Sequence, residues 1–324
     1  MKFLNSTSLY YDDVNLIAQP NALIKSRKDI IEERWRILVS PMASVIGEKF
    51  ALEAFNLGLS ICLHRFCKPK EELDIFKQFP SQYSESNKKR IWCSIGLNDL
   101  ERFNLLYENG ARNFLIDCAS GYLETVVRFT EILSEYQGIS LIVGNVHDKV
   151  GFNLYKRINL SNNSSFGIRI GIGNGSACET ATKATGYGRG QITEISECSA
   201  FRENEFHLVI ADGGVRSGSC AVKALCAGAD MIMLGGYFSL AEEAQNVING
   251  EYKFWGSASH YNQEKFGGIR AHCEGKVLEL DKSQIKPLKD LVNDLVTGIS
   301  SGCSYTGKSK WKDMIGQGVF EIKK

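Results

Sequence analysis

The sequence predicts an α/β fold of the (β/α)8 type, a closed barrel of eight parallel strands with helices outside. Short apolar runs recur at intervals of roughly 20 to 40 residues, with a helix-like stretch between most runs and the next. The runs are continuously apolar, which is typical of strands buried on both faces. Polar and glycine residues follow the runs, where barrel enzymes carry their sites. An open doubly wound sheet is the alternative, but no G-x-G-x-x-G motif opens the first helix.

Each predicted strand is a short run of β-branched or other apolar residues that ends in a turn-forming segment. In chain order the runs cover residues 37–40, 59–63, 91–96, 114–117, 141–144, 166–170, 208–211 and 231–234. The helix-like stretches include residues 48–57, 99–109, 122–136, 220–227 and 240–249.

The chain continues to residue 324 after the eighth run. Residues 254–280 hold glycines among polar residues and are interpreted as a long loop or flap over the barrel mouth. Residues 287–299 predict an amphipathic helix, followed by a glycine- and serine-rich turn at 298–307 that leads into residues 308–314. Without a repeat or inserted segment, residues 1–324 are expected to form one catalytic barrel domain with a C-terminal helix and tail at 287–324.

The composition predicts a soluble protein with a large buried core. Hydrophobic residues make up 44% of the chain and charged residues 23%, with a net charge of +1 and no basic stripe, so we expect no nucleic-acid partner. The ten cysteines form no C-x-x-C motif and no tight zinc quartet. Reduced thiols, the lack of a signal sequence and the lack of a long apolar run indicate a cytoplasmic protein with no membrane partner.

A glycine-rich loop at residues 171–180 is the most informative segment, because it also carries Ser176 and Cys178. Such a loop offers backbone N–H groups to an anion and holds a thiol close by. Two glycine pairs end the seventh and eighth runs, where barrel enzymes commonly bind phosphate: Gly213-Gly214 and Gly235-Gly236. The sequence therefore predicts a phosphorylated substrate that is attacked by sulfur.

Motifs along nearly the whole chain match one family pattern. Residues 11–14 (Y-D-D-V) and 40–45 (S-P-M-A-S-V) are similar to D-D-V and S-P-M-D-x-V, and residues 172–178 (I-G-N-G-S-A-C) to the loop G-x-G-x-G-S-x-C. Residues 188–193 echo G-x-P-Q-x-T/S, and residues 212–216 and 234–236 resemble two phosphate-binding strands. The chain thus resembles the inosine monophosphate dehydrogenase and GMP reductase family.

Three further segments, residues 116–122, 270–276 and 298–307, resemble the GMP reductase branch of this family. Only 27 positions separate His64 from Ile91, which leaves no room for the regulatory domain usual in the dehydrogenases. The chain departs from the family at Ala43, Glu179 and Ala181, where Asp, Thr and Arg are usual, and its flap is shorter. These changes leave the cofactor and the exact purine open.

The resemblance implies that Cys178 is the nucleophile and that Thr180 and Glu274 move protons to and from the leaving ammonia. Purine C2 is electrophilic, and an ordinary thiol is mostly protonated at neutral pH, so the loop must favour the thiolate through backbone N–H groups or a positive dipole. Taken alone, Cys178 is an inert loop thiol, Glu274 a solvated charge and Thr180 a helix N-cap.

For substrate binding, the two glycine pairs and Ser176 are assigned to the phosphate, because glycine lets backbone N–H groups converge on a dianion. Asp212 is expected to accept hydrogen bonds from the ribose hydroxyls. Ser257 and Arg270 are assigned to the phosphate or base from the flap. The alternatives are plain turn geometry for the glycines and a helix-capping role for Asp212.

The resemblance also implies NADPH as the cofactor, with the nicotinamide side lined by Asp117, Ser120, Gly121 and Tyr122. Ser301 and Tyr305 would reach the cofactor of a neighbouring subunit in a homotetramer; the alternative is a polar C-terminal turn. A monovalent cation such as K+ would lie at Gly173, Gly175 and Cys178. His64 is interpreted as a core or rim histidine rather than a base.

The predicted activity is the NADPH-dependent reductive deamination of GMP to IMP through a cysteine–purine covalent intermediate. The alternatives are an IMP dehydrogenase, which oxidises IMP with NAD, and a non-catalytic purine-nucleotide-binding relative. A phosphate-binding barrel aldolase would need a lysine at a strand end, and no predicted strand ends in lysine.

Overall fold

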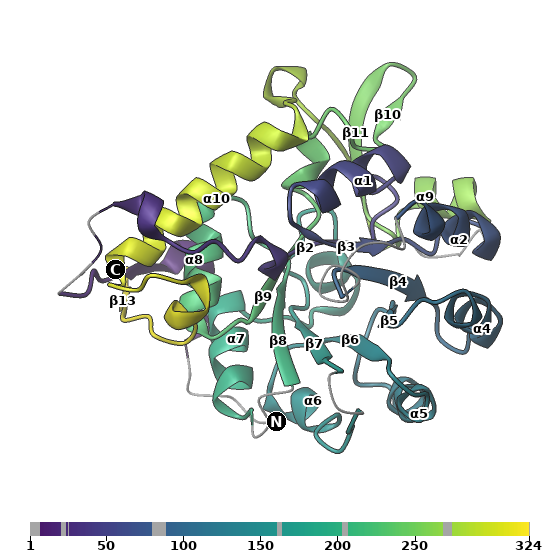
Figure 1. Ribbon diagram of the computed structural model, residues 1–324, viewed down its shortest axis with the longest axis horizontal. Coiled ribbons are helices and arrows are strands. Elements are labelled where there is room, and N and C mark those ends of the chain that lie inside the picture. The colour runs from purple at the N-terminus through teal and green to yellow at the C-terminus, as the bar shows by residue number, and fades with distance from the viewer. Residues whose placement is uncertain are drawn as a thin grey trace.

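The computed structural model describes residues 7–20, 24, 26–79, 89–160, 164–202, 207–267 and 274–323. Eight parallel strands follow one another around a closed barrel, which confirms the predicted fold class (Figure 1). They are β2 (Ile37–Val39), β3 (Ser60–Leu63), β4 (Ile91–Ile95), β5 (Asn113–Ile116), β6 (Ser140–Val146), β7 (Phe166–Ile170), β8 (His207–Asp212) and β9 (Met231–Leu234). The first and last residues of each strand agree with those of a predicted run to within two residues. β9 pairs with β2 and closes the barrel.

Side chains along each strand point alternately into the barrel and outward to the helices. The inward set forms an apolar cluster of its own: Leu38, Cys62, Trp92, Leu115, Ile142, Ile210, Met231 and Met233. Gly167 of β7 leaves room in this interior, because a Cβ there would lie 2.6 Å from Ile210. The outward set packs against the helices in a larger core.

Helices surround the barrel, and several begin at side-chain caps. Asp99, Asp148 and Ser217 accept backbone N–H bonds at the starts of α4 (Leu100–Glu108), α6 (Lys149–Asn153) and α8 (Gly218–Ala227). The helices are α1 (Glu48–Asn56), α2 (Pro69–Gln78), α4 (Leu100–Glu108), α5 (Glu124–Ser134), α6 (Lys149–Asn153), α7 (Gln191–Ala200), α8 (Gly218–Ala227), α9 (His260–Phe266) and α10 (Leu288–Tyr305). None of these described helices is long and apolar enough to cross a membrane.

Two small antiparallel sheets lie outside the barrel. β1 (Val14–Leu16) pairs with β13 (Phe320–Ile322), and β10 (Val247–Ile248), β11 (Glu251–Trp255) and β12 (Val277–Glu279) form a three-stranded sheet. The remaining short helices are η1 (Tyr11–Asp13), η2 (Arg27–Asp29), η3 (Arg34–Arg36), η4 (Thr180–Thr185), η5 (Phe238–Leu240), η6 (Lys282–Gln284) and η7 (Trp311–Met314).

The helix predicted at 240–249 is wrong. The chain there leaves η5, turns, and enters the β10–β11 hairpin. Ala241, Ala244 and Asn246 are buried, and the Asn246 side chain donates to the carbonyl of Ser239. The apolar residues here have helical spacing, but they are buried in a turn that packs against the barrel. Tertiary contacts therefore outweigh the local preference for a helix.

The C-terminal turn predicted at 298–307 is also wrong for most of its length, because α10 continues to Tyr305. Its glycines serve close helix packing. A Cβ at Gly298 would lie 2.9 Å from Gly218 of α8, and one at Gly302 would lie 2.4 Å from Val222. Figure 1 shows α10 lying across α8. The flap, predicted as a loop, contains α9 and β12 among its described residues.

Candidate active site

Polar side chains that face into the barrel lie at the C-terminal ends of three strands, at the mouth of the barrel. By strand alternation, Asp117, Arg169 and Asp212 lie two positions beyond the interior positions 115, 167 and 210. Arg169 is 5% exposed, although it stands in an otherwise apolar strand. The barrel therefore has an apolar floor and a charged mouth.

Arg169 joins the two carboxylates at this mouth. Its guanidinium lies 3.7 Å from Asp117 and 3.8 Å from Asp212. The Asn145 side chain donates to Asp212 and to the carbonyl of Gly171, both at 2.8 Å. Burial raises the pKa of Asp212, and Arg169 and Asn145 oppose that shift. Asp212 is thus held in one orientation at the end of β8, where a ribose-binding carboxylate was predicted.

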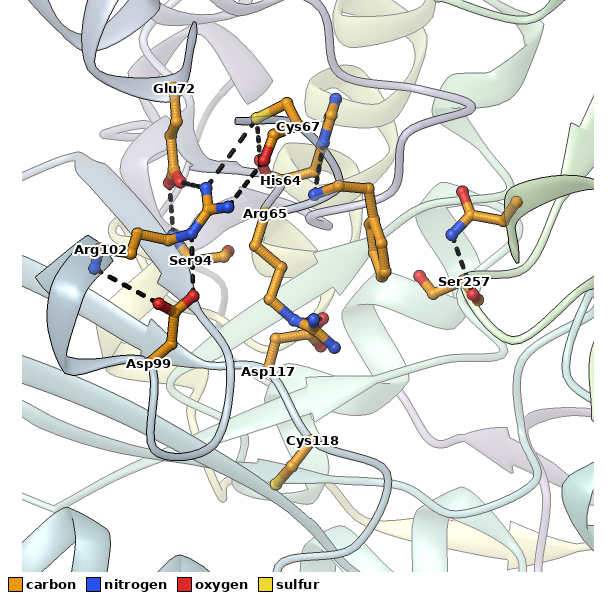
Figure 2. Close-up of polar contacts among 12 residues, drawn as sticks. His64, Arg65, Cys67, Glu72, Ser94, Asp99, Arg102, Asp117, Cys118 and Ser257 are labelled. Atoms are coloured by element: carbon orange, nitrogen blue, oxygen red, sulfur yellow. Dashed lines mark hydrogen bonds and ion pairs between the residues drawn. The ribbon is translucent and has the colours of Figure 1, made fainter. Parts of the chain in front are cut away.

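Arg65 reaches Asp117 from the loop after β3, with 3.0 Å between Nε and Oδ2. Figure 2 shows its guanidinium lying over the Asp117 carboxylate, with Cys118 just beyond. Cys118 is bound through its thiol to the carbonyl of Gly144 at 2.9 Å. The cofactor side predicted from Asp117 therefore has a cation that the sequence analysis did not assign.

A buried ion pair anchors the loop that carries Arg65. The Arg102 guanidinium lies 2.6 Å from Glu72 and 3.0 Å from Asp99, and it donates to the carbonyl of Cys67 at 2.7 Å (Figure 2). Glu72 also accepts from the backbone N–H of Ser94. Burial raises the pKa of Glu72 to about 8, and Arg102 opposes that shift. These contacts tie α2, α4 and β4 to one rim of the mouth.

His64 occupies the same rim. Its Nδ1 accepts from the backbone N–H of Phe66 at 3.1 Å, and its ring stacks on Phe66 and lies near Phe266. Burial lowers the pKa of His64 to about 4. A neutral, packed imidazole of this kind supports the interpretation of His64 as a rim histidine.

Cys178 is exposed, at the end of the loop that follows β7. Its backbone N–H donates to the carbonyl of Gly175 at 3.2 Å, and the N–H of Glu179 donates to the carbonyl of Glu274 at 2.8 Å. Both N–H groups are therefore already used within the protein. The thiol is exposed in this loop, while these two backbone donors stabilise the loop itself.

The returning strand of the flap pairs with this loop. Cys178 and Gly275 form an antiparallel bridge, and the N–H of Lys276 donates to the carbonyl of Ala177 at 3.1 Å. Glu274 is thereby placed beside Cys178 along the backbone. Thr180 begins η4 two residues after the cysteine. The structure describes no side chain for Thr180, and Arg270 lies outside the described residues altogether.

The predicted phosphate residues meet the cysteine loop. A Cβ at Gly213 would lie 3.0 Å from the nitrogen of Gly175, and one at Gly236 would lie 3.0 Å from the Ser176 hydroxyl. Gly213 and Gly214 have φ of +97° and +75°, a region that favours glycine. Ser176, Gly213 and Gly236 therefore lie together at the cysteine loop, whereas Gly235 faces Met42 and Ser40. Ser257, predicted on the flap, follows β11 and accepts through its carbonyl from Asn262 at 3.0 Å.

The residues predicted to line the cofactor mostly make contacts within the protein. The Tyr122 hydroxyl donates to Asp148 at 2.7 Å and accepts from the N–H of His147 at 3.0 Å. Gly121 packs on the backbone of Asn145. The Ser120 hydroxyl is 3.3 Å from the N–H of Tyr122. Ser120 is half-buried in the loop after β5, and Gly121 and Tyr122 pack behind it against the residues that end and follow β6.

Ser301 and Tyr305 lie on the last turns of α10, among contacts with the N-terminal segment. Ser301 accepts from Arg27 at 2.8 Å, and the carbonyl of Tyr305 accepts from the N–H of Gln19 at 2.9 Å. The Tyr305 side chain is 67% exposed. These two hydrogen bonds join α10 to the N-terminal segment and not to the residues of the mouth, so the contact of Ser301 and Tyr305 with a cofactor stays a prediction.

Comparison of the sequence with known proteins shows the family of this chain. The model of the IMP dehydrogenase / GMP reductase domain matches residues 8–323. The chain belongs to the IMP dehydrogenase/GMP reductase family. It is 31% identical to GMP reductase 1 of Mus musculus, with 96% of this chain and 94% of the mouse protein covered. It is 29% identical to the GMP reductase of Klebsiella pneumoniae and 28% identical to that of Enterobacter sp., each with 99% and 96% covered.

The structure describes the environment of two residues that depart from the family pattern, Glu179 and Ala43. Glu179 pairs with Lys183 one helical turn later at 2.7 Å, and Ala43 is buried. The sequence analysis missed Arg65 and Arg169 as site residues. Arg169 was detectable, because it is a charge at an inward position of a continuous apolar strand. Arg65 gave no such signal, since its partner Asp117 is 52 residues away in the chain.

Proposed function

We propose that this protein is a GMP reductase that converts GMP to IMP and ammonia with NADPH. The observation that carries the proposal is the exposed Cys178 thiol beside the converging glycines, with the flap backbone at Glu274 paired next to it. Relatives named GMP reductase, matched over nearly their whole length in bacteria and mouse, support this assignment.

In the proposed reaction the Cys178 thiolate adds to C2 of the guanine. Thr180 and Glu274 pass a proton to the 2-amino group, because an amine leaves far more readily once protonated. The C2–N bond then breaks, ammonia departs, and the purine stays bonded to sulfur. The reduced nicotinamide, when bound, supplies a hydride to C2. The C–S bond breaks last, so that GMP, NADPH and two protons become IMP, NADP+ and ammonium.

Substrate binding follows from the same geometry. Ser176 and the glycine pairs after β8 and β9 would hold the phosphate through their backbone N–H groups and the serine hydroxyl, and Asp212 would accept from the ribose hydroxyls. Ser257 and Arg270 are proposed to contact the phosphate or base from the flap. The pairing of the flap with residues 177–179 would bring it over the bound nucleotide.

We infer that the nicotinamide end of a cofactor would lie at the mouth beyond β5. Arg65, Asp117 and Ser120 offer a cation, a carboxylate and a hydroxyl, which suit an amide and ribose hydroxyls. The buried Nε of Arg169 has no hydrogen-bond partner among the described residues. Gly121 and Tyr122 would set the wall, and Ser301 and Tyr305 would contact the cofactor of a neighbouring subunit.

The test is an assay of nicotinamide absorbance with the native protein and with Cys178→Ala. We expect oxidation of NADPH with GMP and no reduction of NAD with IMP, and a loss of about 10³-fold or more in kcat for the variant. Cys178→Ala should still bind GMP, because the phosphate and ribose contacts remain. Cys67→Ala serves as the matched thiol control and should keep the native rate. Reduction of NAD with IMP alone, or full activity in Cys178→Ala, would contradict the proposal.

The remaining features of the proposed protein are a single barrel domain over residues 1–324, a homotetramer and a cytoplasmic location. The continuous core supports the single domain, and the nine described cysteines are free thiols, which supports a reducing compartment. A monovalent cation such as K+ is proposed at Gly173, Gly175 and Cys178. The nucleotide is proposed as the main partner, without nucleic acid or a membrane.

A further inference from the structure

A buried carboxyl group lies against the cysteine loop. Glu194, in the first turn of α7, is 0% exposed. It accepts from the Asn174 side chain at 3.0 Å and from the backbone N–H of Arg189 at 3.2 Å, and the N–H of Ile172 is a third donor. In the described part of the chain no ion pair reaches Glu194, and the Arg189 guanidinium pairs instead with Glu197 at 2.8 Å.

A carboxyl in such a place is unfavourable unless its hydrogen bonds compensate for the lost hydration. Burial raises the pKa of Glu194 to about 9, and the donors from Arg189, Ile172 and Asn174 oppose that shift. The three N–H donors thus compensate for the burial of this carboxyl group and hold it beside the loop.

The loop needs such an anchor because of its glycines. Gly171 and Gly173 have φ of +144° and +84°, and glycine backbones sample many conformations unless they are tied down. Asn174 carries the side chain that is tied to α7. The next residue, Gly175, accepts the N–H of Cys178 and packs against Gly213. Fixing Asn174 therefore fixes both the turn that carries the thiol and its contact with the phosphate glycines.

We propose that Glu194 is a positioning residue for the cysteine loop. Through Asn174 it sets the turn that presents Ser176 to the nucleotide phosphate and Cys178 to the purine. The identity of the substrate rests on the proposed function above, whereas the positioning of the loop does not. The sequence motifs that indicated the family require no particular residue at position 174 and do not include position 194.

The experiment is a double-mutant cycle of Asn174→Ala and Glu194→Ala, with Glu197→Ala as the matched control. Glu197 lies one turn further along α7 and touches Arg189 without contacting the loop. Three quantities are measured: kcat and KM for GMP, the GMP concentration that half-protects Cys178 from iodoacetamide, and hydrogen exchange of the peptide that contains residues 172–178.

We expect each single variant to raise KM and the half-protecting concentration about tenfold and to speed exchange of the loop, because a buried hydrogen bond to a turn is lost. The double variant should match Glu194→Ala within about twofold, since that substitution already removes the hydrogen bond to Asn174. Glu197→Ala should behave as the native protein. If Glu194→Ala does not fold, Asn174→Ala still tests the inference. The side chain of Asn174 is only half-buried, so its loss should leave the fold intact.

Native-like loop exchange and KM in Asn174→Ala, or effects of the two substitutions that multiply, would overturn the inference. A native protein that neither reduces GMP nor is protected by it would reject the proposed function alone. In that case faster loop exchange in Asn174→Ala, with none in Glu197→Ala, would still support the role of Glu194.

Discussion

His64 shows how burial, as the largest of several effects, lowers the pKa of a residue at the barrel mouth. The residue is 9% exposed and packs beside two phenylalanines, Phe66 and Phe266, with Nδ1 already accepting a backbone N–H. Its pKa is lowered to about 4, first by burial and then by Arg102 and Lys265. The same packing that removes His64 as a base makes it a source of pH-dependent stability.

For His64→Asn we expect a smaller loss of stability on acidification. A histidine in the unfolded chain gains its proton near pH 6.5, whereas native His64 stays neutral until about pH 4. The contribution of His64 to stability is fully present above the pKa of the unfolded chain. As the pH falls below that value, this contribution decreases by up to about 1.4 kcal/mol per pH unit. An asparagine oxygen can replace Nδ1 as the acceptor and does not titrate. Urea unfolding at about pH 7 and about pH 5 should show a fall that is about 1 to 2 kcal/mol smaller in the variant. Equal falls would contradict this assignment.

At the scale of elements, the contact between α8 and α10 depends on the absence of side chains. Gly218 and Gly298 face one another so closely that a Cβ on either would lie within 2.9 Å of the other residue. This close approach lets the rest of α10 bury Leu295, Val296 and Ile299. The glycines that suggested a turn in the sequence are therefore the reason why the helix can lie on its neighbour.

Gly298→Ala should destabilise the protein by about 1 to 3 kcal/mol, because the added methyl group pushes two backbones apart. In a helix without such a neighbour the same change is stabilising by about 1 kcal/mol, so the sign itself tests the packing. Thr297→Ala, on the exposed face of the same helix, is the control and should be neutral or slightly stabilising. Thermal or urea unfolding of the two variants measures the difference. A stabilised Gly298→Ala would mean that α10 does not approach α8 as described.

In the whole molecule, the two ends of the chain close over the outside of the barrel. β1 pairs with β13, the N–H of Ile17 donates to the carbonyl of Val319 at 2.9 Å, and that of Gly318 donates to the carbonyl of Cys226 at 3.1 Å. Val14 of β1 is fully buried. The last residues thus connect the N-terminal segment to α8, whose N-terminal end follows Gly213 and Gly214 after β8.

Ending the chain after Gly316 should lower the free energy of unfolding by about 2 to 4 kcal/mol, because β1 loses its partner and part of its burial. Removal of Lys324 alone is the control and should have little effect. Urea denaturation followed by circular dichroism measures both proteins. Unchanged stability of the shorter chain would show that β13 contributes nothing to the fold.

The sequence by itself determined the barrel, its strands and the neighbourhood of the proposed catalytic residues. Continuous apolar runs and the residues after them are local features, and a parallel barrel brings all its strand ends to one mouth. Cys178, Asp212 and the glycine pairs could be located for that reason. The order of the strands also placed Asp117 on the same rim.

Only the tertiary structure decided which side chains meet. The pairs Arg65–Asp117, Arg169–Asp212 and Asn174–Glu194 join residues from 20 to 52 positions apart. Local pattern also failed at 240–249 and 298–307, where contacts with the barrel and α8 outweighed it. The physical reason is the same in each case: periodicity and turn residues report what a segment prefers, whereas burial and close approach depend on what packs against it.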